Sequence, residues 1–334
     1  MIDVVVVGAG PVGLACAIEA RQAGLDVVVV EKGSLVNSLV GYPSRMEFFS
    51  TPSLMEIGGH PFPTLGYKPT REEGIEYYRR VAEAEQLDIR LYSPVVRIDG
   101  ERDAFRVTTE SGTIDCRNVI VAVGFFDIPN KLAIPGEDLP HVIHYYKEPY
   151  PFSRQNVTII GGKNSAAKAA LDCYRHGANV TMVIRGPEIT DSVKYWIKPD
   201  LINRIAEGSI AAFFNATISA IGESSVAIST PEGHHQIDTD WVLAMTGYRP
   251  DYALLETFGI DTGDDEHRTP IHDANSFETN RPGVYLAGTV CGGLKTSKWF
   301  IENGRFHAAQ IVEHIVSGAT KAHDLEGRHW RTAE

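Results

Sequence analysis

The stretch VVVVGAGPVG at residues 4–13 decides the fold of this chain. Four consecutive valines predict a strand that is buried on both faces, as in a parallel sheet. The glycines after them permit a tight turn and let the backbone approach a pyrophosphate closely. Pro11 suits the first turn of a helix, and Gly24 is expected to end that helix in the left-handed conformation. The order of strand, glycine loop and helix predicts a dinucleotide-binding unit.

Glu31 completes the pattern of the first loop. It follows a second valine strand and stands roughly 20 residues after the loop, where a carboxylate that binds ribose hydroxyls is expected. The start of the predicted helix adds free N–H groups and a partial positive charge for the phosphates. An acid at this position favours a dinucleotide whose ribose carries no phosphate.

A second glycine loop, GGKNSA at residues 161–166, follows another apolar strand. Ala166 takes the place of the third glycine, which the fingerprint allows. Lys163 stands where the second glycine is expected, so its side chain must point away from the pyrophosphate or contact it as a cation. The next apolar strand leads to Arg185 in place of an acid. A guanidinium pairs with a 2′-phosphate, which a carboxylate would repel.

The opposite charges that follow the two loops predict FAD at the first site and NADPH at the second. The alternative for Arg185 is a surface arginine beside a degenerate repeat of the fold. The expected FAD contacts are Gly8, Gly10, Pro11, Val12, Gly13, Glu31, Lys32, Ala122, Gly124, Gly288 and Thr289. The expected NADPH contacts are Gly161, Gly162, Lys163, Asn164, Ser165, Ala166, Arg185 and Gly247. This pair of sites favours an enzyme that passes hydride from NADPH to a bound flavin.

The two loops also predict the fold class. We expect an α/β chain of two Rossmann-like domains, with the NADPH-binding domain inserted in a split FAD-binding domain. The expected boundaries are 1–145 and 248–322 for the two parts of the FAD-binding domain, 146–247 for the NADPH-binding domain and 323–334 for a C-terminal tail. Further strands are expected at residues 105–109 and 119–123, and the last helix at about residues 297–317.

The segment at residues 41–69 is rich in prolines and aromatic residues, and it is too apolar for a disordered linker. It could fold over a flavin ring, with Tyr42, Phe48 and Phe49 as candidate walls. Alternatively, it forms a surface Ω-loop that is packed by its own aromatic side chains.

Composition and charge exclude several classes of protein. Hydrophobic residues make up 43% and charged residues 22% of the 334 residues, which is typical of a globular chain of two domains. The formal net charge of −12 argues against nucleic acid or an anionic membrane as a partner. No apolar run reaches the length of a membrane span and no signal segment is recognisable, so we expect a cytoplasmic protein.

The four cysteines are Cys16, Cys116, Cys173 and Cys291, and no two of them form a C-x-x-C pair. Each is expected to be a small buried residue. Cys16 is a partial exception, because it lies in the first two turns of the predicted helix, where the helix dipole could lower its pKa. No spacing of cysteines or histidines is typical of a metal site, so no metal is expected.

Five longer runs of sequence resemble a known group of flavoproteins. They are GYPSRMEFFSTPSL at residues 41–54, IIGGKNSA at 159–166, SVKYWIKP at 192–199, AMTGYRPDY at 244–252 and FIENGRFHAA at 300–309. Over nearly its whole length the chain resembles the low-molecular-weight thioredoxin reductase-like FAD/NAD(P)H flavoproteins, and among them the bacillithiol disulfide reductase (YpdA-type) family. The resemblance implies FAD at the first site, NADPH at the second and a homodimer.

The chain departs from these relatives at three points. Thioredoxin reductases carry a C-x-x-C pair in the NADPH-binding domain, and this chain has none. The bacillithiol family has a cysteine just before the third glycine of the first loop, where this chain has Val12, so no mixed disulfide can form at that position. Many relatives end the late flavin motif in Gly-Asp, where this chain has Gly288 and Thr289, so a hydroxyl, the backbone or water must replace the carboxylate.

The resemblance and the two sites together predict an NADPH-dependent reductase of a small disulfide, with bacillithiol disulfide as the leading substrate and a redox carrier protein as the alternative partner. The candidate catalytic side chains are Cys16, Cys291, Tyr42 and His307. Three other functions stay open: a ferredoxin– or flavodoxin–NADP reductase of the same fold, a flavin monooxygenase, and a redox-sensing flavoprotein. The monooxygenase motif F-x-G-x-x-x-H is not found between the two loops.

Overall fold

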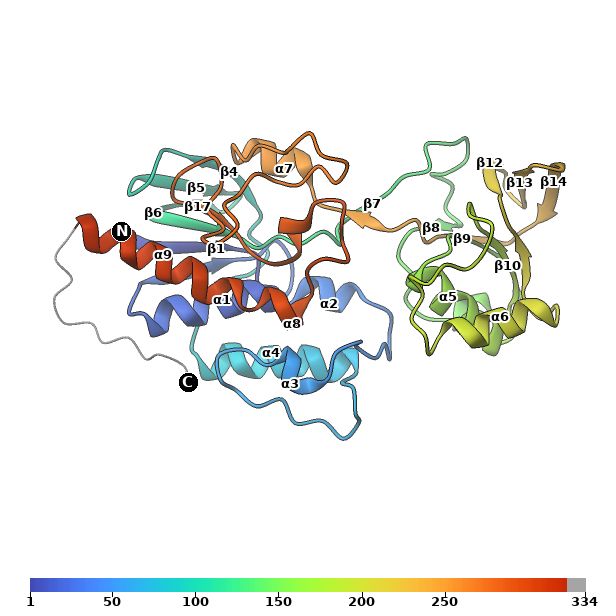
Figure 1. Cartoon of the computed structure of the whole chain (residues 1–334), viewed down its shortest axis with the longest axis horizontal. Coiled ribbons are helices and arrows are strands. Elements are labelled where there is room, and N and C mark those ends of the chain that lie inside the picture. The colour runs from blue at the N-terminus through green and yellow to red at the C-terminus, as the bar shows by residue number, and fades with distance from the viewer. Residues whose placement is uncertain (323–334) are drawn as a thin grey trace. The chain divides into compact units, whose positions relative to one another are not determined.

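The structure, a computed structural model, describes residues 1–322. The chain divides into two compact units, the first built around a mixed sheet and the second around a parallel sheet (Figure 1). The first unit contains Met1–Val40, Arg45–Ile128 and the chain from Tyr248 onward, and the second contains Gly41–Ser44 and Pro129–Gly247. This arrangement confirms the predicted fold class of two Rossmann-like domains, one of them inserted in the other. The predicted tail at residues 323–334 lies outside the described residues.

The valine strand β1 (Ile2–Val7) is central to the sheet of the first unit. It pairs in parallel with β2 (Val27–Val30) and with the second half of β6 (Gly112–Val121). The first half of β6 pairs antiparallel with β5 (Phe105–Thr109), and β17 (Val284–Leu286) pairs in parallel with the end of β6. The valines of β1 are almost completely buried, because helices and loops cover both faces of a parallel sheet.

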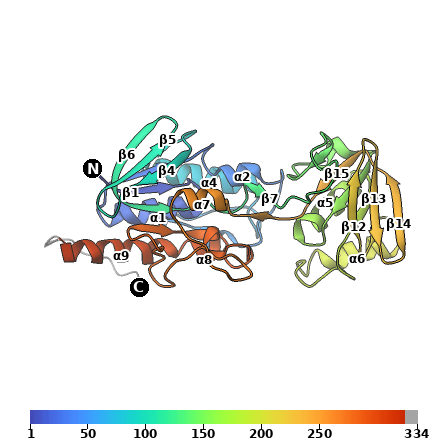
Figure 2. The ribbon, with the colours of Figure 1, turned by 90° about the horizontal axis from the view of Figure 1, so that it is seen from above.

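Two helices of the first unit that are far apart in the sequence pack against each other. Helix α1 (Pro11–Gln22) packs beside α9 (His307–Ala322), and the views in Figures 1 and 2 agree on this contact. Ala20 of α1 and Val312 and Val316 of α9 form a buried apolar cluster there. The remaining elements of this unit are β3 (Asp88–Arg90), β4 (Val95–Asp99), α2 (Asn37–Gly41), α3 (Pro52–Met55), α4 (Arg71–Ala84), α7 (Tyr252–Thr257), the 3-10 turn η2 (Gly288–Gly292) and α8 (Ile301–Gly304).

The second unit repeats the pattern of the first. Its parallel sheet has the order β11–β10–β9–β15–β8, and the glycine loop follows the central strand β9 (Asn156–Ile160). Helix α5 (Asn164–Arg175) buries a row of alanines against the sheet. The other elements are β8 (Val142–Ile143), η1 (Tyr150–Phe152), β10 (Asn179–Val183), α6 (Lys198–Ala206), β11 (Ala211–Phe213), the antiparallel strands β12 (Thr217–Ile221), β13 (Ser225–Thr230) and β14 (Gly233–Asp238), and β15 (Trp241–Ala244).

Two segments join the units, and they pair with each other as β7 (Ile128–Pro129) and β16 (Tyr248–Arg249). The chain enters the second unit at Pro129, whereas the sequence-based boundary lies after residue 145. The reason is that β8 pairs with β15 of the second sheet. The segment at residues 41–69 divides as well, because Gly41–Ser44 belongs to the second unit.

Two predicted elements differ in extent. The expected strand at 119–123 is the end of the longer β6, whose first half forms a hairpin with β5. The expected last helix at 297–317 is wrong at its start, because the chain forms the separate turn α8 and then α9 from His307. Within residues 1–322, none of the helices has both the length and the apolar character that a membrane span requires.

Candidate functional site

The first glycine loop leaves no room for side chains at two of its positions. Gly8 has a φ of +107°, and a methyl group there would lie 2.7 Å from the carbonyl oxygen of Ala122. At Gly13, a methyl group would lie 2.0 Å from the carbonyl oxygen of Gly8. These contacts hold the first turn of α1 against the ends of β1 and β6, which is the packing that the fingerprint requires.

Gly10 has the opposite environment. A methyl group built there meets no described atom within 4 Å, so the loop is open at this point. Gly10 caps α1 without a side-chain hydrogen bond, and Pro11 occupies the first turn. The open backbone at Gly10 thus lies at the positive end of α1, where the first N–H groups have no partner within the helix, and this suits the pyrophosphate of a dinucleotide.

Glu31 lies beside this loop as predicted by its position in the sequence. The carboxylate accepts hydrogen bonds from the backbone N–H of Ala9 at 2.8 Å and of Gly33 at 2.9 Å, and the residue is buried. Burial raises the pKa of Glu31, and the two backbone bonds oppose that effect. Each carboxylate oxygen keeps a lone pair for a ribose hydroxyl. Lys32, by contrast, forms an ion pair with Asp127 at 2.8 Å.

The late flavin motif meets the first loop at the carboxyl ends of the strands. A methyl group on Gly288 would lie 3.2 Å from the Val12 side chain, and one on Gly124 would lie 3.5 Å from the Thr289 hydroxyl. The structure therefore brings together Val12, Gly124, Gly288 and Thr289 from three separate parts of the chain. These residues, with the glycine loop and Glu31, surround one end of α1.

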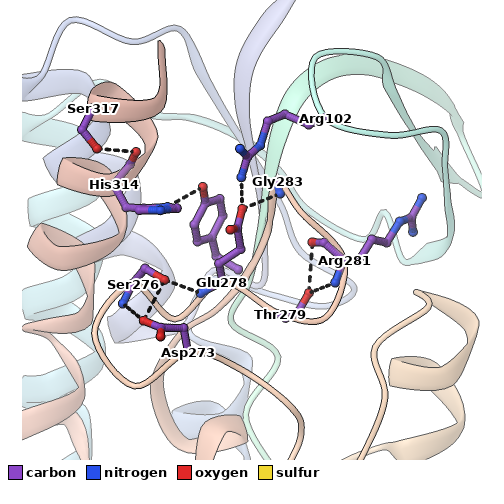
Figure 3. A network of polar contacts seen from close by, with 10 residues as sticks. Arg102, Asp273, Ser276, Glu278, Thr279, Arg281, Gly283, His314 and Ser317 are labelled. Carbon is purple, nitrogen blue, oxygen red and sulfur yellow. Dashed lines mark hydrogen bonds and ion pairs between the residues drawn. The ribbon is translucent and has the colours of Figure 1, made fainter. Parts of the chain in front are cut away.

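A polar network fixes the hairpin that precedes this motif (Figure 3). Glu278 accepts a hydrogen bond from the Gly283 N–H at 2.7 Å and pairs with Arg102. The Tyr285 hydroxyl of β17 lies 3.1 Å from His314 Nδ1 on α9. Sequence reasoning missed this network, because its partners come from distant segments and no motif joins them.

The second glycine loop is equally constrained at its start. Gly161 has a φ of +132°, and a methyl group there would lie 2.6 Å from the carbonyl oxygen of Met245. Lys163 is the N-cap of α5 in an extended conformation, and its side chain does not cap the helix. Gly247 accepts a hydrogen bond from the backbone N–H of Asn130 at 2.9 Å and so belongs to the connection between the units.

Asn164 joins the start of α5 to the segment at residues 190–198. Its side chain accepts a hydrogen bond from the Lys194 N–H and donates one to the Ser192 carbonyl, both at 2.9 Å. Val193 and Ile197 are buried and anchor the segment, whereas Tyr195 and Trp196 between them are exposed. The run SVKYWIKP was noted in the sequence only as a resemblance, and its alternation of buried and exposed residues is the signal for this anchored loop.

Two cationic side chains, Arg185 and Lys163, belong to the second predicted nucleotide site. Both side chains are exposed, and neither forms an ion pair with any residue in the range 1–322. Ser165 is exposed on the first turn of α5, and Ala166 is buried against Gly161. Unpaired cations at a helix N-terminus suit the several phosphates of NADPH.

The cysteine candidates are buried. Cys16 and Cys291, like the other two cysteines, are free and inaccessible. Burial raises the pKa of Cys16 to about 12, so the expectation that the helix dipole lowers it is wrong. Burial also raises the pKa of Cys291, with a smaller contribution from Cys16. Desolvation outweighs the dipole here, because no solvent reaches either sulfur.

The remaining candidates lie in different places. His307 is 1% exposed, and its Nδ1 accepts the Gly288 N–H at 3.1 Å. Tyr42 belongs to the second unit, and Phe48 is buried in the first, where Gly74 makes room for its ring. The described residues contain no cluster of three side chains that could hold a metal ion.

Comparisons with known proteins agree with this geometry. Residues 5–288 match the family model described as pyridine nucleotide-disulphide oxidoreductase. The bacilliredoxin reductase Bdr of Bacillus subtilis is 38% identical over 314 residues, which cover 93% of this chain and 97% of that protein. The structure of the bacillithiol disulfide reductase Bdr (YpdA) from Staphylococcus aureus superposes with a TM-score of 0.92 at 36% identity, covering 95% of this chain and 98% of that chain. A ferredoxin–NADP reductase of Ignicoccus hospitalis is more distant, at 25% identity over 87% of this chain and 90% of that protein.

Proposed function

Because this chain belongs to the pyridine nucleotide-disulphide oxidoreductase family, and within it to the bacillithiol disulfide reductase (YpdA-type) group, we propose that it uses FAD and NADPH to reduce bacillithiol disulfide. It is an oxidoreductase, and the geometry of its two nucleotide sites supports the proposal of FAD and NADPH as cofactors. The assignment of this particular disulfide follows the name of the relative from S. aureus. The name of the relative from B. subtilis points instead to a small protein, a bacilliredoxin, as an alternative acceptor.

One observation carries the cofactor assignment. The first loop is closed by the buried carboxylate of Glu31, and the second is followed by the exposed guanidinium of Arg185, which has no acidic partner within the described residues. A carboxylate accepts hydrogen bonds from free ribose hydroxyls, whereas a guanidinium pairs with a phosphate. The two sites therefore suit FAD and NADPH, respectively, and not two copies of one nucleotide.

The residues of the first site hold and orient the flavin nucleotide. The open backbone at Gly10 and the start of α1 would hold the pyrophosphate, and Glu31 the adenosine ribose. Thr289 offers a hydroxyl next to Gly124. Bound FAD would accept a hydride from NADPH and deliver two electrons to the disulfide.

The residues of the second site bind NADPH at several points. Arg185 would pair with the 2′-phosphate, and the first turn of α5 with Lys163 would hold the pyrophosphate. Asn164 keeps the neighbouring loop in place through its two hydrogen bonds. Holding the nucleotide at several points reduces the entropy that must be lost before hydride transfer.

The substrate disulfide meets no accessible thiol of this chain. All four cysteines lie in the described residues, and all are buried. A buried thiol whose pKa is raised to about 12, like that of Cys16, supplies almost no thiolate at neutral pH. We therefore propose that the disulfide is reduced at the flavin and not through a mixed disulfide with the protein.

The test is anaerobic NADPH consumption by the purified yellow protein. We expect rapid turnover with bacillithiol disulfide and little with glutathione disulfide as the control, and turnover within about threefold of wild type for Cys16→Ala. An oxidised bacilliredoxin is the third substrate tested. If it alone is reduced, the substrate is the carrier protein and not the small disulfide. If NADPH reduces the flavin and none of the three acceptors reoxidises it, the disulfide reductase function is excluded.

We also propose that the protein is a cytoplasmic homodimer. Four free cysteines suit a reducing compartment, and NADPH is available there. Light scattering of the holoprotein, combined with size-exclusion chromatography, should give a mass near twice 36.6 kDa. A monomer at micromolar concentration would contradict this proposal without affecting the assignment of the cofactors.

A further inference from the structure

His307 is the first residue of α9 and lies directly beneath the late flavin motif. Its ring is 1% exposed, and its Nδ1 accepts the backbone N–H of Gly288 at 3.1 Å. The Sγ atom of Cys291, in the same 3-10 turn, is 3.9 Å from the same nitrogen. One imidazole nitrogen therefore binds the turn that carries Gly288 and Thr289.

The hydrogen bond defines the tautomer of this histidine. Because Nδ1 accepts a hydrogen bond from the Gly288 N–H, the proton of the neutral ring must lie on Nε2. Nε2 is buried and has no partner within residues 1–322. A protonated imidazole would have to donate from both nitrogens, and Nδ1–H would then oppose the Gly288 N–H. The contact with the turn requires the neutral ring.

Aromatic side chains hold the ring in this orientation. The ring of Phe277 is stacked on it, with centroids 3.9 Å apart and planes 18° apart. The indole of Trp299 stands perpendicular to it at 4.4 Å. Burial and the nearby His272 and Lys298 lower the pKa of His307 to about 4, so the ring is neutral at physiological pH. A ring clamped between two aromatic groups points its Nδ1 in one direction.

The turn that His307 binds tolerates little displacement. Gly288 has a φ of +79°, and a methyl group there would touch Val12 of the first glycine loop at 3.2 Å. On the other side, a methyl group on Gly304 would lie 3.3 Å from the Gly288 Cα. Gly288 is thus packed between α1 and α8, and its N–H is buried, so that an unpaired amide here would be costly.

From these contacts, and on the basis of the FAD site of the proposed function, we propose that His307 is a positioning residue that holds the Gly288–Thr289 turn in the geometry that binds the flavin nucleotide. The residue does not exchange protons with a disulfide substrate, because its ring is enclosed. Its Nδ1 acts through the turn and not by contact with the nucleotide. The hydrogen bond to Gly288 determines the position of the Thr289 hydroxyl and backbone. This role differs from the catalytic role considered for His307 in the sequence.

Two substitutions of similar polarity test the roles of the two ring nitrogens separately. His307→Asn places an amide oxygen near the position of Nδ1, whereas His307→Gln places it near Nε2. We expect the Asn variant to bind FAD with a Kd within about threefold of wild type, and the Gln variant to bind at least tenfold more weakly, which corresponds to about 1.4 kcal/mol. The Kd is measured by quenching of flavin fluorescence when FAD is added to the apoprotein, without NADPH or any disulfide.

The visible spectrum of the bound flavin is the second measurement, because it reports the surroundings of the ring and not the stability of the fold. We expect altered fine structure in the Gln variant and a wild-type spectrum in the Asn variant. His314→Gln is the matched control, since this histidine lies on the same helix and binds Tyr285 at 3.1 Å (Figure 3). It should leave the Kd for FAD within twofold of wild type.

Equal FAD affinity of the Asn and Gln variants, whether both are unchanged or both are weak, would overturn the proposal. If the Gln variant does not fold, nitrogen NMR of the wild-type holoprotein decides the question. An unprotonated, hydrogen-bonded Nδ1 and a protonated Nε2 on His307 are expected at pH 7, and the reverse tautomer would contradict the role. None of these results depends on the substrate, so failure of the disulfide assignment would leave them intact.

Discussion

At the scale of single residues, Arg185 is the side chain whose role the sequence addresses most directly. Its guanidinium is exposed and has no acidic partner within the described residues, so a phosphate can bind it without displacing another contact. We expect Arg185→Gln to raise KM for NADPH about 10- to 100-fold, as the loss of a charge-assisted pair worth about 1.5–3 kcal/mol implies. KM for NADH, which lacks the 2′-phosphate, should change less than threefold.

Steady-state kinetics with both nucleotides measure this difference. Arg154→Gln is a suitable control, because Arg154 is another exposed arginine of the second unit and lies outside both predicted sites. An equal rise in KM for NADPH and NADH would show that Arg185 contacts a part of the nucleotide that NADPH and NADH share, and not the 2′-phosphate.

The buried imidazole of His307 makes the stability of the first unit depend on pH. Its pKa is about 4 in the folded protein, against an ordinary value of 6.5. Between these values the unfolded chain binds more protons, so the free energy of unfolding is greatest above pH 6.5 and falls as the pH decreases toward 4. A pKa difference of this size corresponds to a loss of about 3 kcal/mol.

Urea unfolding at pH 7 and at pH 4.5 measures this dependence. The pKa values of His272 and His144 are also lowered by burial, so wild type should lose stability from several groups. We expect His307→Asn to lose about 2–3 kcal/mol less than wild type over the same pH range, because asparagine does not titrate. An equal loss of unfolding free energy in the two proteins would show that folding does not lower the pKa of His307.

At the scale of elements, the side chain of Asn164 joins the start of helix α5 to the loop beside it through two hydrogen bonds. Asn164→Ala removes both hydrogen bonds to Ser192 and Lys194. We expect a rise of up to about 30-fold in KM for NADPH with kcat nearly unchanged, since two neutral bonds contribute about 1 kcal/mol each and so about 2 kcal/mol together. Stopped-flow reduction of the flavin at varied NADPH measures the apparent Kd without the disulfide.

The matched control is Asn179→Ala, which removes a side-chain hydrogen bond to Asn156 in the same unit. This variant should show the wild-type Kd for NADPH. If Asn164→Ala also behaves like wild type, the loop at residues 190–198 is held by its buried Val193 and Ile197 alone.

The elements that the sequence predicted well are those with local signals. Valine runs, glycines with a required φ and caps such as Gly24 define β1, α1 and β9, because these patterns lie within a few residues of each other. The start of the last helix was misplaced because the break before His307 depends on the packing of Gly304 against Gly288, a tertiary contact that no local pattern indicates. The dipole argument for Cys16 failed for the same reason, since the burial of its sulfur depends on packing across the whole unit.

At the scale of the whole molecule, the assignment of chain to units follows strand pairing and not the position of the prolines. Residues 129–145 join the second unit because β8 extends its sheet next to β15. Sequence reasoning placed them in the first unit, since a strand of two residues gives no periodic signal. The same limitation applies to Tyr42, whose neighbours Gly41–Ser44 belong to the second unit.

Two sites in two units predict that each nucleotide protects its own unit from hydrogen exchange. A ligand that binds the native state suppresses local opening around its site. FAD added to the apoprotein should therefore slow exchange at residues 8–13, 31–33 and 288–292 of the first unit. NADP⁺ added to the FAD-bound protein should slow exchange at residues 161–166 and 185–194 of the second unit. Mass spectrometry after timed deuterium labelling resolves these segments.

The Arg185→Gln variant makes the experiment specific. With this variant, a fixed, subsaturating concentration of NADP⁺ should lose most of its protection of the second unit, whereas the protection by FAD should remain as in wild type. Protection of the first glycine loop by NADP⁺ in the absence of FAD would mean that the two loops do not discriminate between the nucleotides. The opposite charges of Glu31 and Arg185 would then have no part in selecting them, and the assignment of FAD and NADPH to separate units would have to be abandoned.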